Sequence, residues 1–191
     1  MSNLPDQKFI KKRWFIFGSL MFLIGITFAV IFDVGIGSTN TTEFCISCHS
    51  MKTNFTELQQ TLHWKGVSGV HAGCPDCHVP KEFFPKIIAK VRAVKDIWHE
   101  LMGTIDTPEK FEARRKYLAD LVWQKMKANG SRECRNCHAF EHMDFSLQDK
   151  FARKKHERAS DKGESCIDCH QGIAHKPPPE EESTTPESTI P

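Results

Sequence analysis

The chain has 191 residues, enough for one ordinary domain or for a small domain with an anchor. Its 26 Lys and Arg residues nearly balance its 24 Asp and Glu residues, and a formal charge of only +2 argues against a nucleic-acid-binding protein. Hydrophobic residues make up 39% of the chain, which is low for a bundle of membrane-spanning helices. All eight Cys fall in four copies of one motif, which leaves no thiol for a disulfide framework or a free nucleophile.

The first predicted element is a membrane anchor at residues 14–32. This run carries no charge, and as a helix it would reach about 28 Å, close to the ~30 Å hydrocarbon core of a bilayer. Three basic residues precede it, and the positive-inside bias then keeps residues 1–13 in the cytoplasm. A cleaved signal peptide is the alternative, but its apolar region is shorter and ends in a small-residue cleavage site that residues 33–37 lack. We therefore predict an uncleaved single-pass anchor followed by an exported domain.

Four Cys-x-x-Cys-His motifs follow the anchor. Two thiols three residues apart can form thioethers with the two vinyl groups of one haem, and the adjacent His then faces the iron. Paired zinc knuckles are the alternative, but zinc does not require a His directly after the second Cys in every copy. We predict four covalently bound haem c groups, attached at Cys45 and Cys48, Cys74 and Cys77, Cys134 and Cys137, and Cys166 and Cys169, with His49, His78, His138 and His170 beside them as iron ligands.

The exported part resembles two copies of a dihaem unit, at about residues 41–83 and 130–176. In the first unit His63 lies 11 residues before the second motif, and in the second unit His156 lies 10 residues before the fourth motif. A haem iron can take a second axial ligand, and matched positions outside the motifs suggest a shared role. His63 and His156 are therefore candidate distal ligands.

A third candidate distal ligand, His175, follows the fourth motif and has no His counterpart in the first unit. Three distal His then serve four irons, so the first haem is predicted to differ from the others. Its motif carries another soft ligand, Met51, two residues after His49. The sequence leaves open whether His49 or Met51 holds that iron.

The connection between the units, residues 84–129, is predicted to contain two helices. The first covers residues 85–102, and we expect its apolar face to pack on haem and its charged face to meet solvent. The second runs from about 106 to 129, with a capping residue at its start and a Pro in its first turn. Residues 177–191 are rich in Pro, Glu, Ser and Thr and are predicted to be disordered. The apolar positions of the first helix are Ile87, Ile88, Val91, Val94, Trp98 and Leu101.

These features resemble the NapC/NirT/NrfH family of membrane-anchored tetrahaem cytochromes. The segments that carry the resemblance are residues 45–51 (CISCHSM), 74–80 (CPDCHVP), 103–111 (GTIDTPEKF) and 166–175 (CIDCHQGIAH). The sequence of the segment at residues 103–111 is most similar to the NapC branch, which feeds periplasmic nitrate reductase. The implied fold class is a mostly α and irregular multihaem cytochrome c, with a single N-terminal transmembrane helix and a haem-packed domain built from two dihaem units.

The resemblance implies a quinol dehydrogenase-type electron-transfer protein of the bacterial inner membrane. Such a protein oxidises membrane (mena)quinol and passes electrons through four haems to a periplasmic reductase, here with nitrate reductase favoured. Residues 33–176 would form the periplasmic haem domain. The family's distal ligands also correspond to His63, His156 and His175, in agreement with the repeat argument.

The resemblance further implies a Lys and an Asp near a quinol pocket beside the first haem, at positions that correspond to Lys90 and Asp96. Six residues on a regular helix place these two side chains about 120° apart rather than on one face. Lys86 or Lys95 is therefore an alternative for the Lys. His99, three residues after Asp96, is a candidate proton relay.

Two other functions fit the motifs. One is a passive haem wire that accepts electrons from another membrane complex. The other is a small terminal reductase that acts at the under-ligated first haem, although the anchor and the small size of the domain argue against it.

Overall fold

The computed structural model describes residues 7–66 and 69–179. Within these residues the chain is helical and contains no strand, which confirms the mostly α fold class. The predicted disordered tail lies outside the described residues from position 180 onward. The helices are α1 (Gln7–Ser38), α2 (Thr42–Cys45), α3 (His49–Leu58), α4 (Cys74–His78), α5 (Phe83–Leu101), α6 (Pro108–Ala128), α7 (Arg132–Arg135) and α8 (Lys150–Lys162), with 3-10 helices η1 (Phe140–His142), η2 (Phe145–Leu147) and η3 (Cys166–Asp168).

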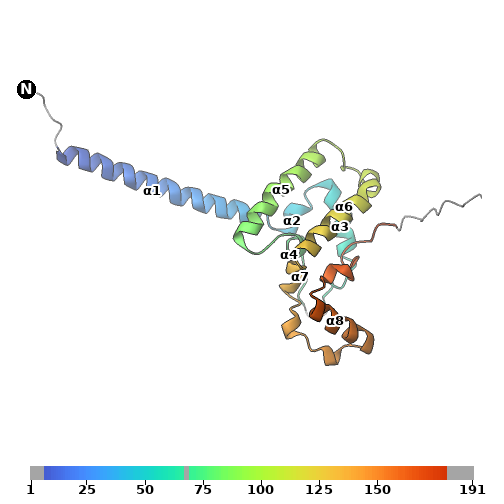
Figure 1. The fold of residues 1–191 in the computed structure, drawn as a ribbon. Coiled ribbons are helices and arrows are strands. Elements are labelled where there is room, and N and C mark those ends of the chain that lie inside the picture. The colour runs from blue at the N-terminus through green and yellow to red at the C-terminus, as the bar shows by residue number, and fades with distance from the viewer. Residues whose placement is uncertain (1–6, 67–68, 180–191) are drawn as a thin grey trace, which may run out of the picture.

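Helix α1 projects away from the rest of the molecule (Figure 1). None of its residues is buried, its mean hydropathy reaches 2.5, and it is long and apolar enough to cross a membrane. It extends beyond the predicted span of residues 14–32 at both ends. Its last turn closes where the Ser38 and Thr39 hydroxyls both donate to the Gly35 carbonyl at 3.0 Å. In the described part of the chain it is the one candidate membrane span.

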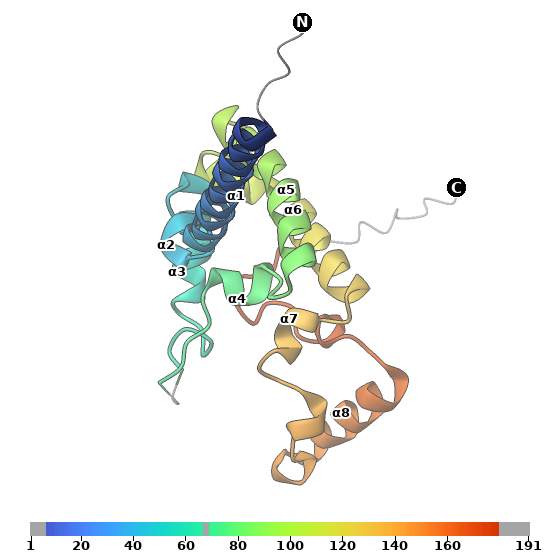
Figure 2. The ribbon, with the colours of Figure 1, turned by 90° about the vertical axis from the view of Figure 1, so that its left-hand side faces the viewer.

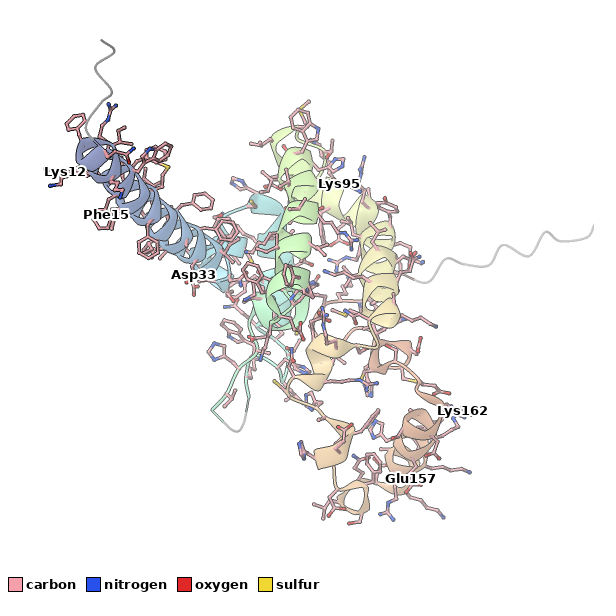
Figure 3. All side chains as sticks on the ribbon, turned by 60° about the vertical axis from the view of Figure 1, so that its left-hand side comes forward. Lys12, Phe15, Asp33, Lys95, Glu157 and Lys162 are labelled. Atoms are coloured by element: carbon pink, nitrogen blue, oxygen red, sulfur yellow. The ribbon has the colours of Figure 1, made fainter. Side chains whose placement is uncertain are left out.

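The remaining helices form an elongated domain at the end of α1. Contacts join α2 to α4, α4 to α7, α3 to α6 and α6 to η3, so the segments that carry the four motifs lie together. Helix α8 lies at the opposite end of the domain from α1, as Figure 3 shows by the positions of Asp33 on α1 and Glu157 on α8. The domain therefore has one end beside α1 and another end far from it.

The start of α6 differs slightly from the prediction. Its N-cap is Thr107, whose hydroxyl accepts from the Lys110 amide at 3.4 Å, because Pro108 takes the first helical position. Asp106, the expected first residue of this helix, instead accepts from Lys110 Nζ at 2.7 Å. Both connecting helices otherwise lie within two residues of their expected bounds.

In the part of the chain that the structure describes, protein side chains do not cover the apolar face of α5, so its expected packing on haem stays a prediction. Its apolar side chains at Ile88, Val91, Val94, Trp98 and Leu101 are exposed rather than packed inward. The reason lies in polar contacts on the other face of the helix. There the Glu100 carboxylate accepts from backbone and side-chain donors of α3, and this anchors the helix by its polar side.

Apolar side chains alone form only a small core in the described residues, consisting of Leu58, Ile105, Phe111, Met126 and Ile167. A charged cluster supplements it. The Arg115 side chain on α6 is only 5% exposed and donates to Glu57 of α3 at 2.6 Å and to Glu112 at 2.6 Å. It also donates to the Lys176 carbonyl at 3.0 Å, so one guanidinium joins α6, α3 and the C-terminal segment.

Replacing Arg115 with Leu should destabilise the protein strongly. The change leaves the Glu57 carboxylate, itself only 19% exposed, without its counter-ion, and breaking such a pair costs about 3–5 kcal/mol. For a chain of this size that corresponds to a fall in melting temperature of about 6–20 °C. The matched control is Lys116→Leu, which removes an exposed ion pair with Asp120 and should cost less than about 1 kcal/mol. Thermal melts of the two haem-loaded variants that coincide would contradict a structural role for Arg115.

Candidate haem-ligand pairs and quinol site

Three of the motifs fold into a single helical turn. The His138 amide donates to the Cys134 carbonyl at 2.9 Å, and the His170 amide donates to the Cys166 carbonyl at 2.9 Å. The second motif is helix α4 itself. Because residues three apart on a helical turn share a face, this fold presents both thiols to the same side. The first motif differs, since Cys45 ends α2 and His49 begins α3.

One contact recurs in both predicted dihaem units. Three residues before the first motif, the Thr42 hydroxyl accepts from the Cys74 amide of the second motif at 3.2 Å. Three residues before the third motif, the buried Ser131 hydroxyl accepts from the Ile167 amide of the fourth motif at 3.2 Å. In each unit a hydroxyl upstream of one motif therefore fixes the turn of the next. This agrees with the internal repeat seen in the spacing.

Motifs that follow one another in the chain also lie next to one another in space. The Cys45 and Cys74 thiols lie close enough to interact, and this interaction raises the pKa of Cys45 and lowers that of Cys74 to about 7. Burial raises the pKa of Cys77 to about 11, and the nearby Cys134 thiol adds to this rise. Burial also raises the pKa of Cys134, with a further contribution from Cys166. The first motif thus lies beside the second, the second beside the third, and the third beside the fourth.

Each of the three candidate distal His faces the His of one motif. The separations between ring centres are 6.2 Å for His63 and His138, 6.1 Å for His78 and His175, and 5.9 Å for His156 and His170.

These separations fit an iron held between two imidazoles. A metal–imidazole bond is about 2 Å long, and with about 1 Å from nitrogen to ring centre, two rings on opposite sides of one metal lie about 6 Å apart. In the described part of the chain His49 has no such ring partner, and the expectation that the first haem differs stays a prediction. Two of the pairs cross between the units: His63 faces the third motif, and His175 faces the second.

The ring environments also suit metal ligands. Burial lowers the pKa of His78 to about 4 and lowers that of His175, which favours the neutral imidazole that binds metal. His175 Nδ1 lies 4.0 Å from Glu57 Oε2, and His156 Nδ1 lies 2.7 Å from Gln148 Oε1. The Gln148 contact can orient the ring of His156, whereas His175 Nδ1 is too far from Glu57 for a hydrogen bond and has no hydrogen-bond partner in the described structure. Neither Glu57 nor Gln148 belongs to a motif, so neither was predicted from the sequence, and Glu57 lies more than 100 residues from the His it faces.

Lys90 and Asp96, the residues expected at a quinol site, are not brought together. Lys90 Nζ donates to the Thr39 hydroxyl at 2.9 Å and to the Thr39 carbonyl, and burial lowers the pKa of this ammonium group. Asp96 is exposed on α5, about 9 Å further along the helix axis. No hydrogen bond or ion pair joins these two described residues. Lys90 therefore serves to fix α5 to the end of α1.

His99 has a defined tautomer in this geometry. The Thr104 hydroxyl donates to the His99 carbonyl at 2.9 Å and lies 3.0 Å from His99 Nδ1. Because a hydroxyl has one proton, it must accept from Nδ1–H, which leaves Nε2 as the ring nitrogen that Thr104 does not engage. The free Nε2 is the atom that a proton relay would use.

Glu100 is a site residue that the sequence did not reveal. Its carboxylate accepts from the His49 amide at 2.8 Å and from the Ser50 hydroxyl at 2.6 Å, at the first turn of α3. Asp96 lies one turn earlier on the same side of α5, so this contact places Asp96 close to the first motif. No local pattern could have predicted it, since the partners lie 50 residues apart.

A small cavity of about 190 Å³ lies between the end of α1, α4 and the start of α5. Lys86 and Asn40 line it, whereas Lys90 and Asp96 do not. Asn40 Oδ1 is buried without a hydrogen-bond partner in the described structure. Of the two alternatives for the Lys of the quinol site, Lys86 thus lies at a cavity and Lys95 is exposed on α5 (Figure 3).

A helical chain with four Cys-x-x-Cys-His turns behind one apolar helix defines a multihaem c-type cytochrome. Residues 8–180 match the N-terminal region of the NapC/NirT cytochrome c family. The chain belongs to this family.

Three relatives are similar to the chain over most of their own length. A putative tetraheme cytochrome-c type protein of Allochromatium vinosum is 58% identical over 161 residues, covering 84% of this chain and 88% of the relative. The cytochrome c-type protein NapC of Escherichia coli K12 is 51% identical, covering 82% and 79%. The denitrification system component NirT of Stutzerimonas stutzeri is 49% identical, covering 81% and 77%. No solved structure matches the chain significantly.

Proposed function

We propose that the chain oxidises a membrane quinol and delivers the electrons to a soluble reductase on the periplasmic side. The observation that carries this proposal is the order of the motifs. The first motif follows α1 by a few residues, each motif neighbours the next, and the fourth faces α8 at the far end of the domain (Figure 1). A haem bound at each motif supplies a one-electron carrier.

The paired His rings support a ligand assignment for three irons. His175 would complete the second haem, His63 the third and His156 the fourth. The first haem, held by His49 or Met51, has no distal His and remains the reactive end beside the membrane. This assignment also supports transfer rather than terminal reduction, because the three later irons would have both axial positions filled by the chain.

Quinol oxidation releases two protons with its two electrons, so a base is needed near the first motif. Asp96 lies one turn from Glu100, which contacts that motif, and it is exposed and able to return a proton to solvent. His99 has a free Nε2 three residues further on and is a second candidate. Lys86, which lines the nearby cavity, could bind a quinone oxygen.

For the electron acceptor, the similarity to NapC proteins favours a periplasmic nitrate reductase. The similarity to a denitrification system component and to TorC, which is 43% identical, supports the more general class of soluble respiratory reductases.

The direct test is reduction of the purified full-length protein by menadiol, a water-soluble menaquinol analogue, followed at the haem absorption bands. Rapid reduction of all four haems supports quinol oxidation. Haems that menadiol leaves oxidised, but that dithionite reduces, would indicate a passive wire instead. Rapid reoxidation of the reduced protein by nitrite would indicate a terminal reductase.

A topology prediction accompanies this function. A reporter enzyme that is active only in the periplasm should be active when fused after Pro191, because the basic residues before the apolar run hold the N-terminus in the cytoplasm. A reporter active only in the cytoplasm, fused at the same position, should be silent. The reverse pattern would contradict the proposed orientation and remove the route to a periplasmic reductase.

A further inference from the structure

Helix α5 presents a continuous apolar surface to the outside of the domain. At about 100° per residue, its apolar side chains occupy about half of the helix circumference. Phe84 is 75% exposed, Val91 67% and Leu101 76%. Large contiguous apolar surfaces of this kind mark interaction sites. We define the α5 apolar stripe as Phe84, Ile88, Val91, Val94, Trp98, Leu101 and Met102, all of which are exposed.

The opposite side of α5 is the side that packs on the haem domain. Glu100 accepts from the His49 amide and the Ser50 hydroxyl of α3, and Ala89 and Ala93 on the same side are half-buried. These contacts fix the rotation of the helix about its axis. The α5 apolar stripe is therefore turned away from the first haem motif.

The stripe lies at the end of the domain where α1 leaves it. Lys90 Nζ donates to Thr39, the residue directly after α1, so the two helices are joined at this point. Figure 2 views the molecule from the side on which α1 projects, and α5 lies on this near face. Helix α5 runs across the end of α1 rather than continuing it (Figure 1).

The length of α1 sets the height of α5 above a bilayer. The uncharged run ends at Phe32, and residues 33–38 continue the helix for about 9 Å. Headgroup layers extend roughly 5–8 Å beyond the hydrocarbon core on each side. With α1 across the membrane, the axis of α5 thus lies close to the outer boundary of the headgroup layer, and its side chains, which reach about 5–6 Å from the axis, extend into that layer. A helix with one apolar face can bury that face by about 5–10 Å in this zone.

The charges beside the stripe suit a phospholipid surface. At about 100° per residue, Lys90 lies at one edge of the stripe and Arg92 at the other. Lys95 lies within the stripe, where a long side chain can cover apolar surface while its charged end reaches the headgroups. Basic residues at the edges of an apolar face are typical of helices that lie in the membrane interface, since they bind anionic headgroups. Trp98 within the stripe is a residue type that prefers this zone.

We propose that α5 lies flat in the periplasmic headgroup layer, with its apolar stripe in contact with lipid acyl chains, as a second membrane contact beside α1. This inference is independent of the electron-transfer proposal, because it concerns the position of the domain. Together α1 and α5 would fix both the height and the tilt of the first motif relative to the bilayer.

The test is lipid photo-crosslinking in nanodiscs that hold one copy of the full-length haem-loaded protein. The discs contain phosphatidylethanolamine, phosphatidylglycerol and a phosphatidylcholine with a diazirine in its acyl chain. After digestion with trypsin, the Asp96–Lys110 peptide of α5 is compared with the Tyr117–Lys125 peptide of α6, which also contains a Trp. We expect at least tenfold more lipid adducts on the α5 peptide, at Trp98, Leu101 or Met102.

A matched pair of variants extends the test. Leu101→Glu should reduce the adducts on α5 at least fivefold, whereas Tyr117→Glu, a comparable change at an exposed position of α6, should not alter them. Equal labelling of the two wild-type peptides would overturn the proposal. An unlabelled α5 peptide would also overturn the proposal. A face that normally binds a second copy or a soluble partner would be uncovered in a single-copy disc, and it would still not contact acyl chains. The readout needs no electron transfer, so its outcome does not depend on the proposed quinol oxidation.

Discussion

Replacing His175 with Ala is expected to convert one low-spin haem, the one attached at the second motif, to a high-spin form. The His175 ring faces His78 at 6.1 Å, a separation that fits two imidazoles on one iron. Removing one of them leaves that iron with a single strong axial ligand. His63→Ala and His156→Ala should have the same effect on the third and fourth haems. Electron paramagnetic resonance of the oxidised proteins should then show a different low-spin signal missing in each variant.

The controls for these variants are two His that have no motif His as a ring partner. His71 is exposed and its ring is tilted against Trp64 at 4.9 Å, and His142 is exposed in η1. Their Ala variants should keep every low-spin signal. Paramagnetically shifted NMR signals would identify the affected haem, because high-spin iron in His63→Ala should perturb residues near Cys134 rather than near Cys45. Perturbation confined to the first unit would show that His63 serves its own unit and that the crossed pairing is incorrect.

Replacing Asp96 with Asn is expected to slow reduction by quinol at least tenfold. The change preserves shape and removes a base, and loss of one general base typically costs ~10²–10⁴ in rate. The variant should still bind four haems and be fully reduced by dithionite. Stopped-flow reduction by menadiol, followed at the haem bands, measures the effect.

The matched control for this variant is Asp120→Asn on α6, which removes an exposed carboxylate from an ion pair with Lys116. It should reduce at the wild-type rate. If Asp96→Asn also reduces at that rate, the proton acceptor must be sought at His99, whose Nε2 is free, or at the haem propionates. A rate loss in both variants would point to a general electrostatic effect.

Local sequence patterns predicted the helices and motifs of this chain well. Apolar periodicity, Pro108 at a first turn and the uncharged run of α1 are all properties of adjacent residues, and these elements appear within a few residues of the expected positions. The candidate distal ligands were also found from spacing. Their pairing was not, because His63 and His175 each face a motif in the other unit, and spacing within a unit carries no information on such a contact.

The orientation of α5 shows the same limit. Its amphipathic pattern correctly predicts a helix with one apolar face, but periodicity alone does not say what that face meets. Which side of α5 faces the rest of the domain depends on Glu100 and Lys90, whose partners lie about 50 residues earlier in the chain. Likewise, no pattern near His175 indicates that Glu57 and Arg115 hold the segment around it.

The crossed His pairs have a consequence for how the protein matures. A chain exported from its N-terminus presents the second motif to the haem-attachment machinery long before His175 arrives. With His175 facing His78, the second haem would receive its distal ligand only when residues 170–176 fold back, a closure held by Glu57, which accepts from the Lys176 amide at 2.9 Å. Premature termination anywhere before His175 would therefore leave an open coordination site in the first half of the protein, and ordering of the C-terminal segment becomes the final step of assembly.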